Sequence, residues 1–216
     1  MSQIDFSYIP IFFVVFLFSL SFHEAAHAWT ADQFGDPTGR YMGRVSLNPV
    51  AHIDIFGTII FPLVCMLSGS MMFGWAKPVP VNPMNMKDPK RGDIWVSLAG
   101  PLSNGILAVI FFFLFKLFFF SSFFNSAVFG SLERPIQMLV STGLTLNVVL
   151  MIFNLIPIPP LDGSHVLRNL LTGGAAEFYE RIEQFGGILL MLLVFTGVTG
   201  MIVRPVLGVI DLLLTW

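Results

Sequence analysis

The sequence predicts an all-α membrane protein, a polytopic helical bundle of about five to six apolar segments. The first observation is composition: of 216 residues, 55% are hydrophobic and 11% are charged, whereas a typical soluble domain carries about 25% charged residues. The mean hydropathy of +0.81 agrees with this. The second observation is a series of apolar runs of about 20 residues, which is the length that a helix needs to cross a bilayer.

Charge and cysteine content exclude other classes of protein. A nucleic-acid-binding protein needs a basic patch, but here 11 Lys and Arg face 13 Asp and Glu. Cys65 is the only cysteine, so no intrachain disulfide can form. The connectors between apolar runs are short. We therefore expect residues 1–216 to form a single integral membrane domain, with a core at about 8–170 and C-terminal apolar segments at 185–216.

Five runs are candidates to cross the membrane: Tyr8–Ala31, Ile53–Phe73, Ile94–Phe120, Pro135–Pro157 and Phe185–Val203. A shorter apolar tail, Pro205–Trp216, is either a short last span or an interfacial helix. Met1–Ser7 contains no Lys or Arg and therefore lacks the basic region of a signal peptide. The first run is expected to remain as a transmembrane helix.

The second run differs from the others because glycine and proline interrupt it, at Gly57, Pro62, Gly69 and Gly74, and it leads into the proline-rich stretch 75–83. Proline removes a backbone donor, and broken backbone inside a membrane is tolerated only where protein packs around it or a cavity is lined. The sequence therefore favours a re-entrant or hairpin element at 53–74, between the first and the middle core helix.

The distribution of basic residues supports the re-entrant arrangement. If every run crosses, three of the nine loop Lys and Arg lie on one side and six on the other. If residues 53–74 re-enter, Arg134 alone lies opposite the other eight, which are Arg40, Arg44, Lys77, Lys87, Lys90, Arg91, Arg168 and Arg181. Since cytoplasmic loops are enriched in Lys and Arg, these eight are expected in the cytoplasm.

The first run holds a His-Glu-x-x-His pattern formed by His23, Glu24 and His27. Positions i and i+4 share one face of a helix, so both imidazoles can bind one metal ion. Glu24 can then act as a base toward water activated by that metal. The alternative is a pair of membrane histidines packed against a buried glutamate. That arrangement leaves costly polar groups without a partner.

A third metal ligand is expected because catalytic zinc usually has three protein ligands and one open position. Asp162 is the only other acid deep in an apolar context, in the sequence NLIPIPPLDG that ends at Gly163. Prolines unwind the helix there. Asp162 could instead cap a helix end. With residues 53–74 re-entrant, the helices before Asp162 and around His23 run parallel, which brings both side chains to one depth.

These motifs resemble a known family. HEAAH in a first apolar helix and NLIPIPPLDG in a later one resemble the two signature motifs of the site-2 protease family of intramembrane zinc metalloproteases. AGPLSNG, residues 99–105, resembles the family's middle core helix. The similarity covers about residues 8–170, and the GWAKPVPV segment resembles the short prokaryotic branch without PDZ or CBS domains. Ser164 departs from the pattern, since many members have glycine there.

The resemblance implies roles for individual residues. His23, His27 and Asp162 would bind one Zn²⁺ per chain, and Glu24 would be the general base. Asn154 would lie near the metal and hydrogen-bond the scissile carbonyl or the developing oxyanion, or else form an interhelical hydrogen bond. The substrates would be transmembrane proteins or peptides, cut within or near their membrane segments in regulated intramembrane proteolysis. The protein would be multi-pass in the cell membrane, with its active site nearer the cytoplasmic face.

Other polar positions have less specific interpretations. Gly100 and Asn104 are expected to serve close helix packing. His52 is expected at the membrane interface, although a role beside the metal or at a second metal is the alternative. His165 is expected to be water-exposed, or else to face the site. The rival functions are a metal-binding membrane transporter and a non-catalytic protein that binds membrane segments. The sequence predicts no oligomeric state.

Overall fold

The computed structural model describes residues 8–67, 74–120, 130 and 132–215. It is 78% helical, and the described residues contain no strand. Within the described part of the chain, three helices are long and apolar enough to cross a membrane: α1 (Tyr8–Gln33), α4 (Pro89–Phe120) and α5 (Glu133–Asn154). The number becomes four if the bent pair α8 (Gly186–Phe195) and α9 (Val198–Thr215) is one span. The predicted all-α membrane fold is confirmed.

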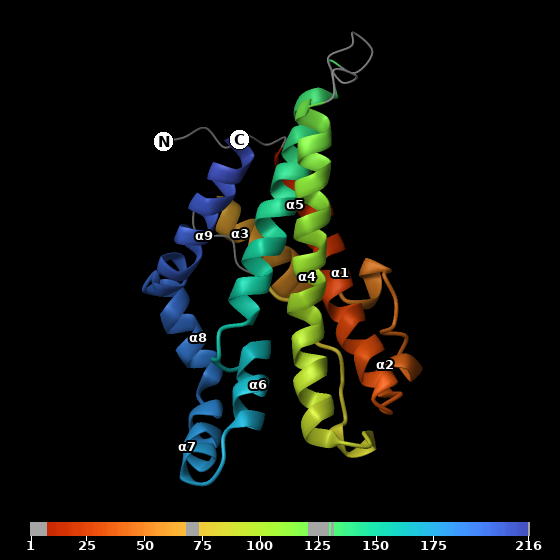
Figure 1. Ribbon diagram of the computed structural model, residues 1–216, viewed down its shortest axis with the longest axis vertical. Coiled ribbons are helices and arrows are strands. Elements are labelled where there is room, and N and C mark those ends of the chain that lie inside the picture. Colours follow the sequence, from red (N-terminus) through yellow and green to blue (C-terminus); the bar gives the residue numbers. More distant parts are fainter. Residues whose placement is uncertain (1–7, 68–73, 121–129, 131, 216) are drawn as a thin grey trace.

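Helix α4 is the central element of the bundle. It packs against α5, α1 and α6 (Asp162–Leu170), and α1 also contacts α5. In Figure 1, α4 rises while α1 and α5 both descend, so the helix that carries the two histidines and the helix that precedes Asp162 run parallel, as expected.

The two largest clusters of buried apolar residues hold the helices together. The first joins α4, α5 and α9, and the second joins the beginning of α1 to the stretch after the re-entrant segment. The buried members of the first are Leu107, Ala108, Phe111, Phe115, Val140, Leu144 and Ile210; those of the second are Phe12, Phe16, Leu20 and Ala76. In a soluble core, removing a CH₂ group from water stabilises the fold by about 0.8 kcal/mol. Between helices in a lipid bilayer, close packing supplies most of the attraction instead.

The segment between α1 and α4 supports the predicted hairpin. It contains a π-helix, η2 (Ile55–Ile60), and α3 (Phe61–Leu67), which together are too short to span. Its two arms meet, because Trp75 N–H donates to Gly57 O at 3.0 Å and Lys77 N–H donates to His52 O at 2.9 Å. The chain therefore returns to the level at which it left. Residues 68–73 of the predicted run lie outside the described residues.

The remaining elements are short and lie outside the three long helices. They are α2 (Thr38–Tyr41), η1 (Pro49–Ala51), η3 (Pro83–Asn85) and α7 (Gly174–Glu183). At the C-terminal end, the predicted boundaries are wrong. The expected run Phe185–Val203 is broken between α8 and α9, where Gly197 has φ +76°, and the two helices differ in direction by 59°. Pro205, expected to begin a separate tail, lies inside α9.

Buried Asp36 ties the turn after α1 to the loop before α4. Its carboxylate accepts hydrogen bonds from Thr38 N–H at 3.2 Å, Asn82 N–H at 2.6 Å and Asn85 Nδ2 at 2.8 Å. Burial alone would raise the pKa of this carboxyl, but the hydrogen bonds from Thr38, Asn85 and Asn82 outweigh burial and hold the pKa below its usual range.

Replacing Asp36 by alanine should lower the free energy of unfolding by about 1–3 kcal/mol at pH 7, because buried donors lose their acceptor. The pKa of Asp36 is lower in the folded state than in the unfolded state. The stability that its carboxylate contributes is therefore complete above the unfolded pKa of about 3.9 and is lost as pH falls through the folded pKa. Unfolding in detergent at pH 7 and pH 3 checks this, with exposed Asp211→Ala as control. A stability difference that is the same at both pH values would contradict it.

Candidate metal centre

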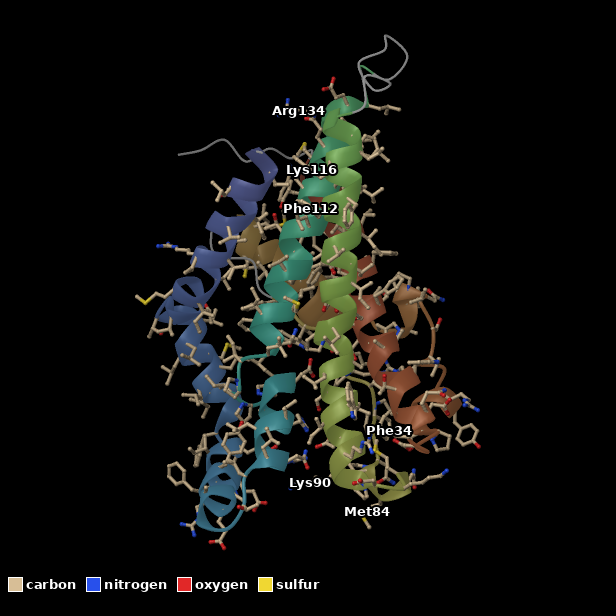
Figure 2. The ribbon with its side chains drawn as sticks, viewed as in Figure 1. Phe34, Met84, Lys90, Phe112, Lys116 and Arg134 are labelled. Carbon is tan, nitrogen blue, oxygen red and sulfur yellow. The ribbon has the colours of Figure 1, made fainter. Side chains whose placement is uncertain are left out.

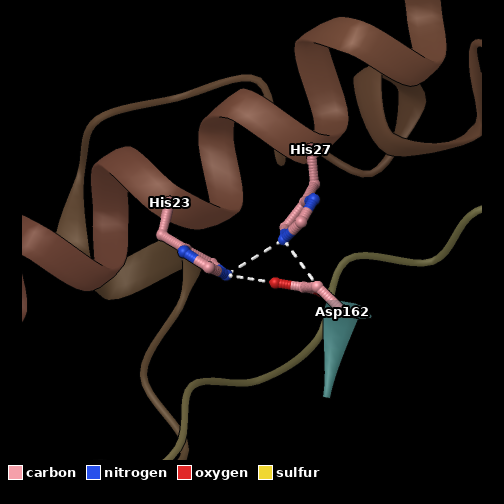
Figure 3. Close-up of side chains that lie close together, drawn as sticks. All are labelled: His23, His27 and Asp162. Carbon is pink, nitrogen blue, oxygen red and sulfur yellow. Dashed lines mark hydrogen bonds and ion pairs between the residues drawn. The ribbon is translucent and has the colours of Figure 1, made fainter. Parts of the chain in front are cut away.

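Two histidines on one face of α1 form the first half of the site. His23 and His27 are one turn apart, both are buried, and their Nε2 atoms lie 3.0 Å from each other. Figure 3 shows both rings directed toward the beginning of α6. The i, i+4 spacing of the sequence thus produces a pair of convergent nitrogens, as expected.

Asp162 is the first residue of α6 and supplies the second half. Its Oδ2 lies 3.1 Å from His23 Nε2 and its Oδ1 lies 3.4 Å from His27 Nε2. The N-cap position of α6 is Leu161, so Asp162 does not cap the helix. A Cβ at Gly163 would lie 2.3 Å from Leu155 O, so glycine is required where the chain turns tightly from α5 into α6.

The three side chains fit a zinc ion. Their ligand atoms are 3.0–3.4 Å apart, close to the edge of about 3.3 Å of a tetrahedron with ligands at 2.0–2.1 Å. The Oδ2 atom of Asp162 is buried and has no hydrogen-bond partner. His27 Nδ1 lies 2.7 Å from Val96 O, and a carbonyl only accepts, so the neutral ring keeps its Nε2 lone pair. Acceptor atoms that face one another in this way call for a cation between them.

Glu24 lies beside this cluster and outside it. Its buried carboxylate accepts a hydrogen bond from Val79 N–H at 3.1 Å through Oε2. It is not among the three residues whose ligand atoms lie within 4.8 Å of one another. Both Glu24 and the cluster line one cavity of about 490 Å³. This position suits a proton acceptor that works beside a metal instead of binding it.

Asn154 ends α5 and lines the same cavity. Its Nδ2 donates to Leu150 O of its own helix at 3.0 Å. The side-chain hydrogen bond that the structure describes for Asn154 is therefore within α5, and none to another helix is among the described contacts.

Two residues of α4 lie closer to the site than the sequence indicated. A Cβ at Gly100 would lie 2.3 Å from His27 Nε2 and 2.6 Å from His23, so the α4 backbone lies directly against both imidazoles. Asn104 is fully buried, and its Oδ1 is 2.6 Å from His23 Nδ1. The sequence signal for this contact was a glycine and an asparagine at i and i+4 within an apolar run. The expectation that Asn104 serves helix packing alone was incomplete, because Asn104 also contacts His23.

The structure also places the other two histidines. His52, whose side chain is buried within the protein, has its Nε2 2.8 Å from Ser46 O. His165 lines the cavity with its Nδ1 3.6 Å from Asp93 Oδ1, so it is not a purely exposed cap. No sequence pattern singled out Asp93, which joins α6 to α4 by accepting hydrogen bonds from Arg168 at 2.9 Å and Asn169 at 2.5 Å.

Comparison with known proteins places the chain in a family. Residues 11–194 match peptidase family M50. The chain belongs to this family. The resemblance to site-2 proteases is thereby confirmed, and the chain is an M50 membrane metallopeptidase.

Named relatives are similar to this chain over most of its length. YwhC of Bacillus subtilis (strain 168) is 37% identical over 94% of this chain and 88% of its own length. Rip2 of Mycolicibacterium smegmatis is 31% identical over 88% of this chain and 70% of its own length. Both are named as candidate zinc metalloproteases. MJ0392 of Methanocaldococcus jannaschii, named a zinc metalloprotease, is 26% identical over 75% of this chain and 34% of its own length. No solved structure shows a significant match.

The contact between Gly100 and the histidines yields a prediction. Gly100→Ala should weaken zinc binding by more than about 10-fold, because its Cβ overlaps His27 Nε2 and displaces both rings. Zinc content after purification and chelator competition would measure this. Gly105→Ala, on the same helix, is the matched control, since its Cβ meets only the flexible Met151 thioether. Wild-type zinc affinity in Gly100→Ala would show that the rings have room to move.

Proposed function

We propose that His23, His27 and Asp162 bind one zinc ion in this M50 peptidase, and that Glu24 and Asn154 act on the peptide bond beside it. The observation that carries the proposal is the convergence of three buried acceptor atoms at 3.0–3.4 Å. Three protein ligands leave a fourth tetrahedral position open, which is the arrangement of catalytic zinc. The zinc metalloprotease names of the relatives support the identity of the ion.

Glu24 carries the proton chemistry in this proposal. When bound, zinc polarises a carbonyl and lowers the pKa of a coordinated water to about 7. The Glu24 carboxylate takes the proton that the attacking water loses and delivers it to the amine of the departing chain. Its hydrogen bond to Val79 N–H holds one oxygen, so the proton transfer is assigned to the other oxygen.

Asn154 assists at the carbonyl. It sits at the end of α5, where the cavity wall passes from α5 to the turn before Asp162. An amide donor at this position stabilises negative charge that develops on the scissile carbonyl oxygen. Binding of substrate would replace its present hydrogen bond to Leu150 O.

The cavities fit a membrane-embedded substrate. A second cavity of about 450 Å³, lined mainly by apolar residues of α1, α5 and α9, shares Gly74, Leu150 and Phe153 with the first. Side chains of a transmembrane segment would fill this space next to the metal. The substrates proposed are therefore transmembrane proteins or peptides, cut within or near their membrane segments.

The Glu24 position favours hydrolysis over metal transport. A transport site would be expected to use each nearby carboxylate as a ligand, whereas Glu24 lies outside the convergent group. Glu24→Gln should lower cleavage of single-span substrates by about 10²–10⁴-fold and retain zinc, while Asp162→Asn should lose zinc as well.

These two variants are compared by zinc content per chain and by cleavage in detergent, with wild type alongside. A Glu24→Gln protein that still cuts would exclude Glu24 as the base. A wild-type protein without zinc would exclude the metal site itself.

We further propose that the site lies nearer the cytoplasmic face. His27 is close to the C-terminal end of α1, Asn154 ends α5, and α4 begins at Pro89 on that same side. Figure 2 shows Lys90 and Arg134 at opposite ends of the molecule. The first end carries most of the Lys and Arg of the chain and is therefore assigned to the cytoplasm.

Cysteine labelling tests this orientation. In a Cys65→Ser background, Lys90→Cys should react with a membrane-impermeant maleimide only after the cells are opened, whereas Arg134→Cys should react in intact cells. Both positions are exposed, and the labelling is normalised to that in detergent. The reverse pattern would place the metal centre near the outer face.

A further inference from the structure

A chain of buried hydrogen bonds leads from His23 across three helices. Asn104 Oδ1 of α4 lies 2.6 Å from His23 Nδ1, and Asn104 Nδ2 donates to Asn147 Oδ1 of α5 at 2.9 Å. Asn147 Nδ2 in turn donates to Ser19 Oγ of α1 at 2.9 Å and to Gly143 O at 2.8 Å. The side chains of Ser19, Asn104 and Asn147 are 0% exposed.

The far end of this chain determines its direction. The carbonyl of Gly143 can only accept, so Asn147 must present its NH₂ group there. The Oδ1 atom of Asn147 then faces Asn104, so Asn104 must donate a hydrogen bond to it from its own NH₂ group. That group also lies 3.4 Å from Ser19 O, another pure acceptor. Asn104 therefore has its carbonyl oxygen left for His23, and a carbonyl oxygen needs a donor.

We propose that Asn104 is a positioning residue that places the proton of neutral His23 on Nδ1 and leaves the Nε2 lone pair for the metal. The inference rests on the proposed zinc site. Nε2 of His23 is the atom that faces His27 and Asp162, and hydrogen bonding at one ring nitrogen decides which nitrogen is free to bind a metal. His27 obtains the same tautomer from the backbone carbonyl of Val96.

The ring of His23 needs this partner more than an exposed histidine would. Among the described residues no backbone carbonyl contacts its Nδ1, and the side chain that does, Asn104, is itself fully buried. Breaking one bond of the chain would leave buried amides unsatisfied. A purely structural role for Asn104 would require polar packing between α1 and α4, and would not require an acceptor at His23 Nδ1.

Zinc affinity separates the two roles. Chelator competition on the full chain in detergent should show Asn104→Leu binding zinc about 10–100-fold more weakly than wild type. Asn104→Asp should recover most of the affinity, because a carboxyl group of nearly the same shape still offers an acceptor oxygen to His23 Nδ1. Ser103→Ala is the matched control on α4, since Ser103 donates only to Gly100 O of its own helix, and it should bind as wild type does.

The tautomer itself is the second readout. Nitrogen-15 spectra of the metal-free protein, with His23 assigned through His23→Gln, should show the proton on Nδ1 in wild type and in Asn104→Asp, and a shift toward Nε2 in Asn104→Leu. If Asn104→Leu does not fold, Asn147→Leu replaces it: Asn104 then loses its anchor, and an intermediate loss of affinity is expected.

Two results would overturn the proposal: wild-type zinc affinity with an unchanged tautomer in folded Asn104→Leu, or a loss in Asn104→Asp as large as in Asn104→Leu. Failure of the zinc site is a separate outcome. Wild type would then bind no zinc, while the metal-free spectra would still report whether Asn104 sets the tautomer.

Discussion

The structure depends on the need to compensate three acceptor atoms buried in an apolar bundle. His23, His27 and Asp162 bring two imidazole nitrogens and a carboxylate within 3.4 Å of one another, and both histidines are buried. Without a cation, such a group costs several kcal/mol. The parallel course of α1 and α5, the unwound turn after Asn154 and the returning hairpin all serve to bring these atoms together.

Helix α4 is the frame on which this convergence is built. It lies between the other two long helices and supplies three contacts to the histidines. Val96 O contacts the His27 ring, Asn104 contacts the His23 ring, and the Gly100 backbone lies against both. Asp93, one turn before Val96, binds α6 through Arg168. One helix thus orients ligands that are more than a hundred residues apart in the sequence.

The sequence predicted much of this because the constraints were local. His23 and His27 share a helix, and Asp162 follows prolines that cannot continue one, so spacing indicated these three residues as candidates, and the family resemblance implied that they form one ligand set. The positions of Asn104 and His52 could not be predicted, since an asparagine or histidine in an apolar run has the same local pattern whether it packs, faces lipid or contacts a ligand. The break at Gly197 was missed because α9 accommodates Pro205, and proline was the stronger sequence signal.

Gly100 also determines how α4 can slide. A shift by one helical turn, about 5.4 Å, would bring Val96 or Asn104 to the position opposite His27. A side chain there would meet the imidazoles well inside van der Waals distance, as the 2.3 Å approach of a single Cβ shows. Because position 100 lacks a side chain, whereas Val96 and Asn104 do not, α4 can pack on α1 in one position along its axis. Any sliding of α4 along its axis would therefore be limited to a fraction of a turn.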